Sequence, residues 1–155
     1  MTAPRSLTIW KASMVLIDAN VLVYAHRTEA AGHEAYRRWL EACVGSEAAF
    51  GVSDRVLGEF LRVVTHPRIF KVPTPLAEAI HVVADLRAQP NCVLLTPGPR
   101  HWEIFLRLCH SVEARGSLVA DAYLAALAIE TGSEWITTDR GYSRFPGLRW
   151  RHPLD

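Results

Sequence analysis

The sequence predicts an α/β domain in which a mainly parallel sheet of about five strands lies between two layers of helices. Short apolar runs rich in Val and Ile alternate with longer segments whose apolar residues recur every three or four positions. Continuous apolar runs are typical of strands buried on both faces, and their alternation with helices is typical of a parallel sheet. With 155 residues, of which 50% are hydrophobic and 21% are charged, the chain has the size and composition of one globular domain.

Glycine and proline set the expected boundaries of these elements, because both interrupt regular structure. Examples are Gly45, Pro67, the Pro97–Pro99 segment and Gly132. The expected strands are 14–17, 48–52, 92–95, 134–137 and an edge strand at 148–150, the first four of them buried. The expected helices are 21–26, 33–44, 54–64, 76–87, 100–110 and 118–130, with one helical turn at 140–145. Trp102 and Leu106 are expected on the buried face of the helix at 100–110. The domain therefore spans 14–155, and 1–13 is predicted to be a loosely ordered N-terminal extension.

Composition narrows the classes of protein that fit. Three cysteines without a Cys-x-x-Cys pair argue against a disulfide framework and indicate a reducing, cytoplasmic location. No run approaches the about 18 apolar residues of a membrane span. The net charge of +1 gives no overall attraction to nucleic acid. Arginine outnumbers lysine by 15 to 2, which fits phosphate binding and equally fits an Arg-biased genome.

Four acids stand out by their positions. Asp18 and Asp139 each follow a predicted buried strand, and ligands of open α/β sheets bind at the carboxyl ends of the strands. Asp121 lies in the predicted first turn of a helix that is apolar almost all round, with no basic residue in helical reach. Glu59 lies at the margin of an apolar helix face.

Each acid also has a purely structural interpretation. Asp18 could cap the following helix, Glu59 could pair with Arg55 or Arg62, and Asp121 could interact with the helix dipole. The dipole stabilises by only about 0.3–1 kcal/mol, less than the cost of burying an unpaired carboxylate. Four carboxylates in one cleft would hold protons or hard cations such as Mg²⁺ or Mn²⁺, the usual partners of phosphate substrates.

The ordered set of acids and their flanking residues resembles a known family. The chain carries Asp18-Ala19-Asn20-Val21, Glu59, Asp121-Ala122 and Thr137-Thr138-Asp139-Arg140, with connecting segments at 65–70 and 141–148. This pattern resembles PIN-domain ribonucleases, and more closely the VapC toxins of bacterial type II toxin–antitoxin pairs. The resemblance covers Met14 to about Pro153.

The resemblance implies a three-layer α/β/α fold and a Mg²⁺- or Mn²⁺-dependent endoribonuclease that leaves 5′-phosphate and 3′-hydroxyl ends. By position, the catalytic and metal-binding residues are Asp18, Glu59, Asp121 and Asp139. Asn20 and Thr137 would orient these carboxylates. The implied partners are RNA, a small cognate antitoxin that neutralises the toxin, and a second copy of the chain in a homodimer.

RNA binding needs further residues. Arg140 and Arg144, interleaved with Tyr142 and Phe145, are candidates beside Asp139, because Arg binds phosphate and aromatic rings stack on unpaired bases. Arg68, in the loop after the Glu59 helix, is another candidate, and a merely solvated surface remains open for all of these side chains.

Three other functions fit the sequence less well than a nuclease does. A non-catalytic RNA-binding or protein-interaction module on the same fold would have a depleted acidic set, whereas all four acids are present. A phosphotransferase with Asp18 as nucleophile would need a late phosphate-binding Lys, and none follows Lys71. A Rossmann domain would need a Gly-rich turn after the first strand, which is missing.

Overall fold

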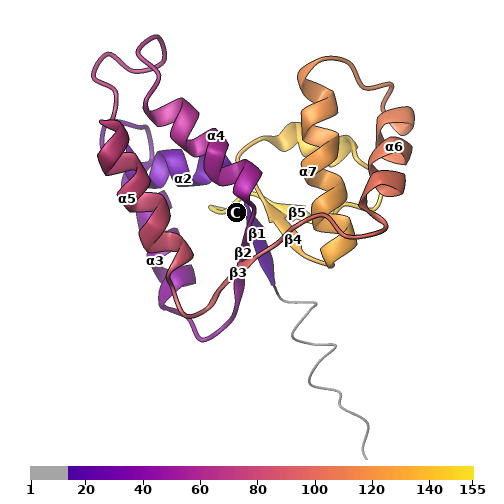
Figure 1. Ribbon diagram of the computed structural model, residues 1–155, viewed down its shortest axis with the longest axis horizontal. Helices are drawn as coiled ribbons and strands as arrows, with labels where there is room; N and C mark the ends of the chain where they lie inside the picture. The colour runs from indigo at the N-terminus through magenta and orange to yellow at the C-terminus, as the bar shows by residue number, and fades with distance from the viewer. Residues whose placement is uncertain (1–13) are drawn as a thin grey trace, which may run out of the picture.

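A computed structural model describes residues 14–155, so the predicted extension at 1–13 lies outside the described part of the chain. A five-stranded sheet runs through its centre in the order β3-β2-β1-β4-β5, and every neighbouring pair is parallel (Figure 1). The strands are β1 (Val15–Ile17), β2 (Phe50–Val52), β3 (Cys92–Leu94), β4 (Glu134–Ile136) and β5 (Trp150–Arg151). The predicted α/β class and the parallel sheet are confirmed.

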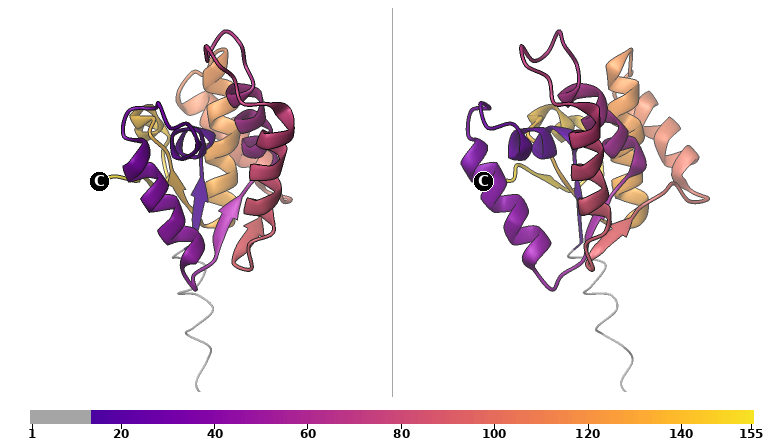
Figure 2. Two further views of the ribbon diagram at one scale, coloured as in Figure 1. Left: turned by 90° about the vertical axis from the view of Figure 1, so that its left-hand side faces the viewer. Right: turned by 60° about the vertical axis from the view of Figure 1, so that its left-hand side comes forward.

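Six α-helices cover the two faces of the sheet. They are α2 (Ala19–His26), α3 (His33–Gly45), α4 (Asp54–Val64), α5 (Leu76–Arg87), α6 (His101–Ser111) and α7 (Ser117–Thr131), and a 3₁₀ turn, η1 (Arg140–Arg144), precedes β5. Helices α2 to α5 lie on one side of the strands and α6 and α7 on the other (Figures 1 and 2). This division follows from right-handed crossovers, because the chain moves outward to β2 and β3 and then returns past β1 to β4.

The core lies between these layers and is built from the residue types that the sequence pattern predicts. The largest fully buried side chains include Trp135, Phe50, Phe60, Leu16 and Ile17, from three strands and α4. Ser53 caps α4 by accepting a hydrogen bond from the Arg55 amide, and Gly132, with φ 67°, ends α7. Among residues 14–155, no helix is both long and apolar enough to cross a membrane.

Three details differ from the sequence prediction. Strand β3 is not buried: Val93 and Leu94 are 37% and 43% exposed, because β3 lies at the edge of the sheet. Trp102 and Leu106 are also exposed, since α6 packs mainly on α7 through its opposite face. The last strand comes two residues later than predicted, at Trp150–Arg151, where it pairs with β4.

Candidate active site in an acidic pocket

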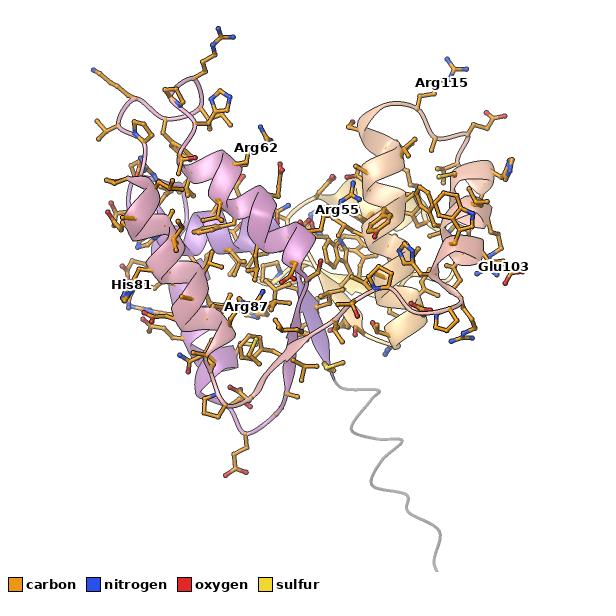
Figure 3. All side chains as sticks on the ribbon, in the orientation of Figure 1. Arg55, Arg62, His81, Arg87, Glu103 and Arg115 are labelled. Carbon is orange, nitrogen blue, oxygen red and sulfur yellow. The ribbon has the colours of Figure 1, made fainter. Side chains whose placement is uncertain are left out.

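All four predicted acids line one pocket of about 620 Å³ at the carboxyl end of the central strands. Asp18 follows β1, Asp139 follows β4, Glu59 projects from α4 and Asp121 from α7. Figure 3 shows α4 and α7 facing each other in this part of the molecule, and residues of both line the pocket. The fold therefore brings together residues that are up to 121 positions apart in the sequence.

Asp18 is the most deeply placed of the four, with 8% of its surface exposed. It is the N-cap of α2, and its Oδ1 accepts a hydrogen bond of 2.7 Å from the Ala19 amide. Its Oδ2 accepts bonds from the Thr137 hydroxyl at 2.7 Å and from Asn20 Nδ2 at 3.2 Å. Asp18 therefore has both predicted roles, because it caps α2 through one oxygen and also lines the pocket.

Asn20 and Thr137 connect the acids of neighbouring strands. The Thr137 hydroxyl donates to Asp18 and accepts a bond of 3.1 Å from the Asp139 amide. Asn20 donates to both Asp18 and Thr137, and its Oδ1 accepts from the Thr138 amide at 3.2 Å. These contacts fix the rotamer of Asp18, so they support the orienting role predicted for Asn20 and Thr137.

The pocket makes it costly to ionise two of its acids, Asp18 and Asp121. Burial raises the pKa of Asp18 to about 6, against the lowering effect of its hydrogen bonds from Thr137 and Ala19, and the charges of Asp121 and Asp139 raise it further. The pKa of Asp121 is also raised, first by burial and then by the charge of Asp139. Burial and the nearby negative charge of Asp139 thus both disfavour the ionised forms of Asp18 and Asp121 in the absence of a cation.

Asp121 lies in the second turn of α7, not in the first as the sequence predicted, so the helix N-terminus contributes little to it. Its Oδ1 accepts a hydrogen bond of 3.2 Å from the Tyr142 hydroxyl. The Tyr142 ring is only 3% exposed and packs between Trp135 and Phe145. Tyr142 was predicted to stack on RNA bases, but its burial leaves only the hydroxyl to act in the pocket.

Glu59 differs from the other acids. Its carboxylate accepts two hydrogen bonds, of 2.7 and 2.9 Å, from the Arg62 guanidinium on the same helix, and its side chain is 47% exposed. Hydrogen bonding to Arg62 holds its pKa below the ordinary value. The structure thus shows the ion pair that the sequence offered as the structural alternative, although Glu59 does line the pocket.

The carboxylates of the pocket fit a divalent cation that keeps several of its waters better than one bound by protein ligands alone. Within residues 14–155, no three His, Cys, Asp or Glu side chains are close enough to enclose a metal ion by themselves. Mg²⁺ commonly binds through one or two carboxylates and keeps several waters. Asp18, Asp121 and Asp139 line one pocket, so one or two of them can bind such a cation directly while the rest contact its waters. A cation would also offset the charge of Asp139 which, after burial, raises the pKa of Asp18 and Asp121.

The arginines predicted to bind RNA lie outside the lining of this pocket. Arg140 pairs with Asp155 at 2.9 Å, and Arg144 donates to the Gly141 carbonyl at 2.9 Å. Arg68 is exposed in the loop that follows α4.

The sequence pattern does not mark Arg55 as an RNA-binding residue, yet among the described residues that line the pocket it is the only Lys, Arg or His. The sequence offered it only as a partner for Glu59. Its position one turn before Glu59 on α4 was the available signal.

The PIN domain family matches residues 15–148, nearly all of the described chain. The fold and the pocket therefore agree with the sequence pattern, and the chain belongs to the PIN-domain family. Among its curated relatives, Ribonuclease VapC43 of Mycobacterium tuberculosis is 46% identical over 92% of this chain and 97% of its own length. Ribonuclease VapC31 of the same species is 39% identical over 90% of this chain and 99% of its own length. The predicted similarity to VapC proteins is confirmed.

Solved structures agree on the fold. VapBC2 from Rickettsia felis, bound to a DNA fragment from its promoter, matches with a TM-score of 0.65 at 17% identity, covering 89% of this chain and 97% of its own. VapC20 from Mycobacterium tuberculosis, described as a sarcin-ricin loop cleaving toxin, matches with a TM-score of 0.61 at 18% identity, covering 87% and 98%. The predicted three-layer PIN fold is confirmed.

Proposed function

We propose that this protein is an endoribonuclease toxin of a toxin–antitoxin pair, and that it hydrolyses RNA with the help of Mg²⁺ or Mn²⁺. The observation that carries the proposal is the convergence of Asp18, Glu59, Asp121 and Asp139 on one pocket. The relatives named VapC ribonucleases, at 38–46% identity over most of the chain, support the same reaction class.

In the proposed reaction, water adds across a phosphodiester bond. The water oxygen bonds to phosphorus, the bond from phosphorus to the 3′-oxygen breaks, and the 3′-oxygen takes up a proton. The products carry 5′-phosphate and 3′-hydroxyl ends. A bound divalent cation supplies charge neutralisation at the phosphate and a more acidic water.

The chain's own residues hold and orient this chemistry. Asp18, Asp121 and Asp139 would bind the cation, while Thr137 and Asn20 keep the Asp18 carboxylate in one rotamer. The Tyr142 hydroxyl donates to Asp121. Glu59 would reach the cation or its water only after release from Arg62, because that ion pair occupies both carboxylate oxygens.

An apolar surface on the other side of α4 supports a protein partner. A second pocket, of about 430 Å³, lies among α2, α3, α4 and α5, and it is lined by Leu22, Leu40, Leu57, Phe60, Val83 and Leu86. Pockets of this type accept the apolar face of an amphipathic helix. We propose that a small cognate antitoxin binds here and that the exposed Leu76 and Ile80 of α5 contribute to a homodimer.

The test is RNA cleavage by the purified Asp18→Asn variant with Mg²⁺ or Mn²⁺. Loss of a charged ligand removes several kcal/mol of transition-state stabilisation, so cleavage should fall at least about a hundredfold, with an unchanged circular dichroism spectrum. Chelation of divalent ions should have the same effect on the wild-type protein. Glu103→Gln is the matched control, because Glu103 is an exposed acid on the outer side of α6 (Figure 3). Cleavage by Asp18→Asn at the wild-type rate would refute the proposal.

A further inference from the structure

Negative charge dominates the lining of the pocket. Among the described residues that line it, four are acids and one, Arg55, is basic. Two further arginines act on these acids from outside the lining: Arg62 pairs with Glu59, and the charge of Arg144 lowers the pKa of Asp121. An RNA strand carries one negative charge per phosphate, so the phosphates on either side of the cleaved bond meet repulsion that one hydrated cation does not remove. If the protein binds RNA in this pocket, as proposed above, a basic residue must face those neighbouring phosphates.

The position of Arg55 suits this task. Its guanidinium lies over the Tyr123 ring, with 4.2 Å between the guanidinium carbon and the ring centroid. Figure 3 shows the side chain reaching from α4 toward α7, and Arg55 lines the pocket. Within residues 14–155, no hydrogen bond or ion pair engages the Arg55 guanidinium. Because its N–H donors lie in the guanidinium plane, a ring against one face leaves those donors open to a ligand.

Tyr123 is itself held in place. Its carbonyl oxygen lies 2.9 Å from His101 Nε2, and its ring contacts the His101 ring at 4.3 Å and the Phe105 ring at 5.6 Å between centroids. His101 and Phe105 are both buried in α6. Arg55 thus rests on a platform fixed by two helices, which reduces the entropy lost when the side chain binds a ligand.

The alternative roles of Arg55 account for less. Arg55 is not the partner of Glu59, since Arg62 makes both hydrogen bonds to that carboxylate. An exposed cation–π contact stabilises by only about 0.5–1 kcal/mol. The charge of Arg55 also helps to lower the pKa of Glu59, but the hydrogen bonds from Arg62 are the first cause of that shift.

We infer that Arg55 is a substrate-binding residue that holds an RNA phosphate adjacent to the cleaved one, and that Tyr123 is a positioning residue that orients its guanidinium. The planar fork of arginine can donate two parallel hydrogen bonds to a phosphate. The inference rests on the proposed ribonuclease function and names the residue that binds the strand beside the cation.

The experiment measures binding of a labelled single-stranded RNA to the non-cleaving Asp18→Asn protein across a range of salt concentrations. Adding Arg55→Ala should raise the Kd about tenfold or more, since a charge-assisted hydrogen bond contributes about 1.5–3 kcal/mol. It should also lower the slope of log Kd against log salt by about 0.7, the value for one phosphate contact on a single strand. Arg55→Lys should keep the slope and still weaken binding, because it retains charge without the fork.

Tyr123 gives a second, independent readout. Tyr123→Leu should weaken binding severalfold without changing the salt slope, because the charge remains while its orientation is lost. Tyr123→Phe keeps the ring under the guanidinium and should rescue binding. A merely structural Tyr123 would instead change the thermal stability and leave the Kd of the folded protein unaltered.

The matched control is Arg107→Ala, which removes an equal charge from an exposed position of α6 outside the pocket. Equal Kd and slope for the Arg55→Ala and Arg107→Ala proteins would overturn the inference. Failure of the proposed function looks different: the Asp18→Asn parent would still cleave RNA or would not bind it. An Arg55→Ala protein that binds like its parent, in a chain that otherwise cuts RNA in an Asp18-dependent way, contradicts only the role of Arg55.

Discussion

The two walls of the acidic pocket carry carboxylates in different states. On the sheet side, Asp18 is buried, accepts hydrogen bonds from Asn20 and Thr137, and has no ion-pair partner among residues 14–155. On the α4 side, Glu59 is half-exposed and neutralised by Arg62. On the sheet wall, the carboxylate of Asp18 is therefore fixed in place without a basic partner. On the helix wall, Arg62 neutralises the carboxylate of Glu59.

This contrast follows from where each acid lies in the fold. Asp18 follows β1 and is enclosed by the elements around it, so it is desolvated and held by the neutral donors Thr137 and Asn20. A residue on a surface helix instead has neighbours three positions away on the same face, and Arg62 is such a neighbour of Glu59. We expect the sheet wall to bind the cation first and the helix wall to join it later.

The largest effect expected from this contrast is a loss of folding stability as Asp18 ionises with rising pH. Its pKa is about 6 in the folded protein and 3.8 when the structure around it is absent, as in the unfolded chain. The folded state therefore holds the proton more tightly. The stability that this proton provides is complete below pH 3.8 and is lost as the pH rises through about 6. Without metal, the free energy of unfolding of the wild type should fall by about 2 kcal/mol from pH 4 to pH 7, relative to Asp18→Asn.

Denaturant unfolding in a chelating buffer at several pH values measures this difference. Comparison with Asp18→Asn cancels the groups that titrate in the same range and do not interact with Asp18. Excess Mg²⁺ or Mn²⁺ should restore wild-type stability near pH 7 and leave the variant less affected. Parallel pH profiles for the two proteins would mean that the sheet wall is not under electrostatic strain.

The same contrast shows what the sequence could predict. Strand ends are visible as apolar runs that stop at an acid, so Asp18 and Asp139 could be placed at the edge of the sheet before the structure was known. The order of strands and helices likewise fixed the three-layer architecture, because parallel crossovers leave few alternatives.

Side-chain partners were harder to predict, because they depend on which faces of the helices remain uncovered. Arg55 and Arg62 were equal candidates to pair with Glu59, and only the structure shows Arg62 paired and Arg55 over Tyr123. Trp102 was expected inside because it is large and apolar, yet α6 is covered on one face only, and this residue is 64% exposed. Such outcomes are set by long-range packing, which local pattern does not encode.

A moderate effect is expected from Thr137→Val, which tests whether the hydroxyl organises the sheet wall. The change removes the donor to Asp18 and the acceptor for the Asp139 amide while nearly keeping the volume. Loss of such supporting contacts typically costs 10–100-fold in metal affinity or activity. Titration with Mn²⁺ followed by calorimetry, together with single-turnover RNA cleavage, measures both quantities. Thr131→Val is the control, because its hydroxyl bonds within α7, away from the pocket.

The smallest effect is expected on the helix wall, from Arg62→Gln. Removing Arg62 frees the Glu59 carboxylate, and exposed ion pairs are worth about 0.2–1 kcal/mol, so Mn²⁺ should bind up to about fivefold more tightly without RNA present. The effect should disappear when Arg62→Gln is combined with Glu59→Gln, because the pair is then already broken. If Arg62→Gln changed the Mn²⁺ affinity equally in both backgrounds, Arg62 would act on the metal site independently of Glu59. The Glu59 carboxylate would then not be kept from the metal by its pairing with Arg62.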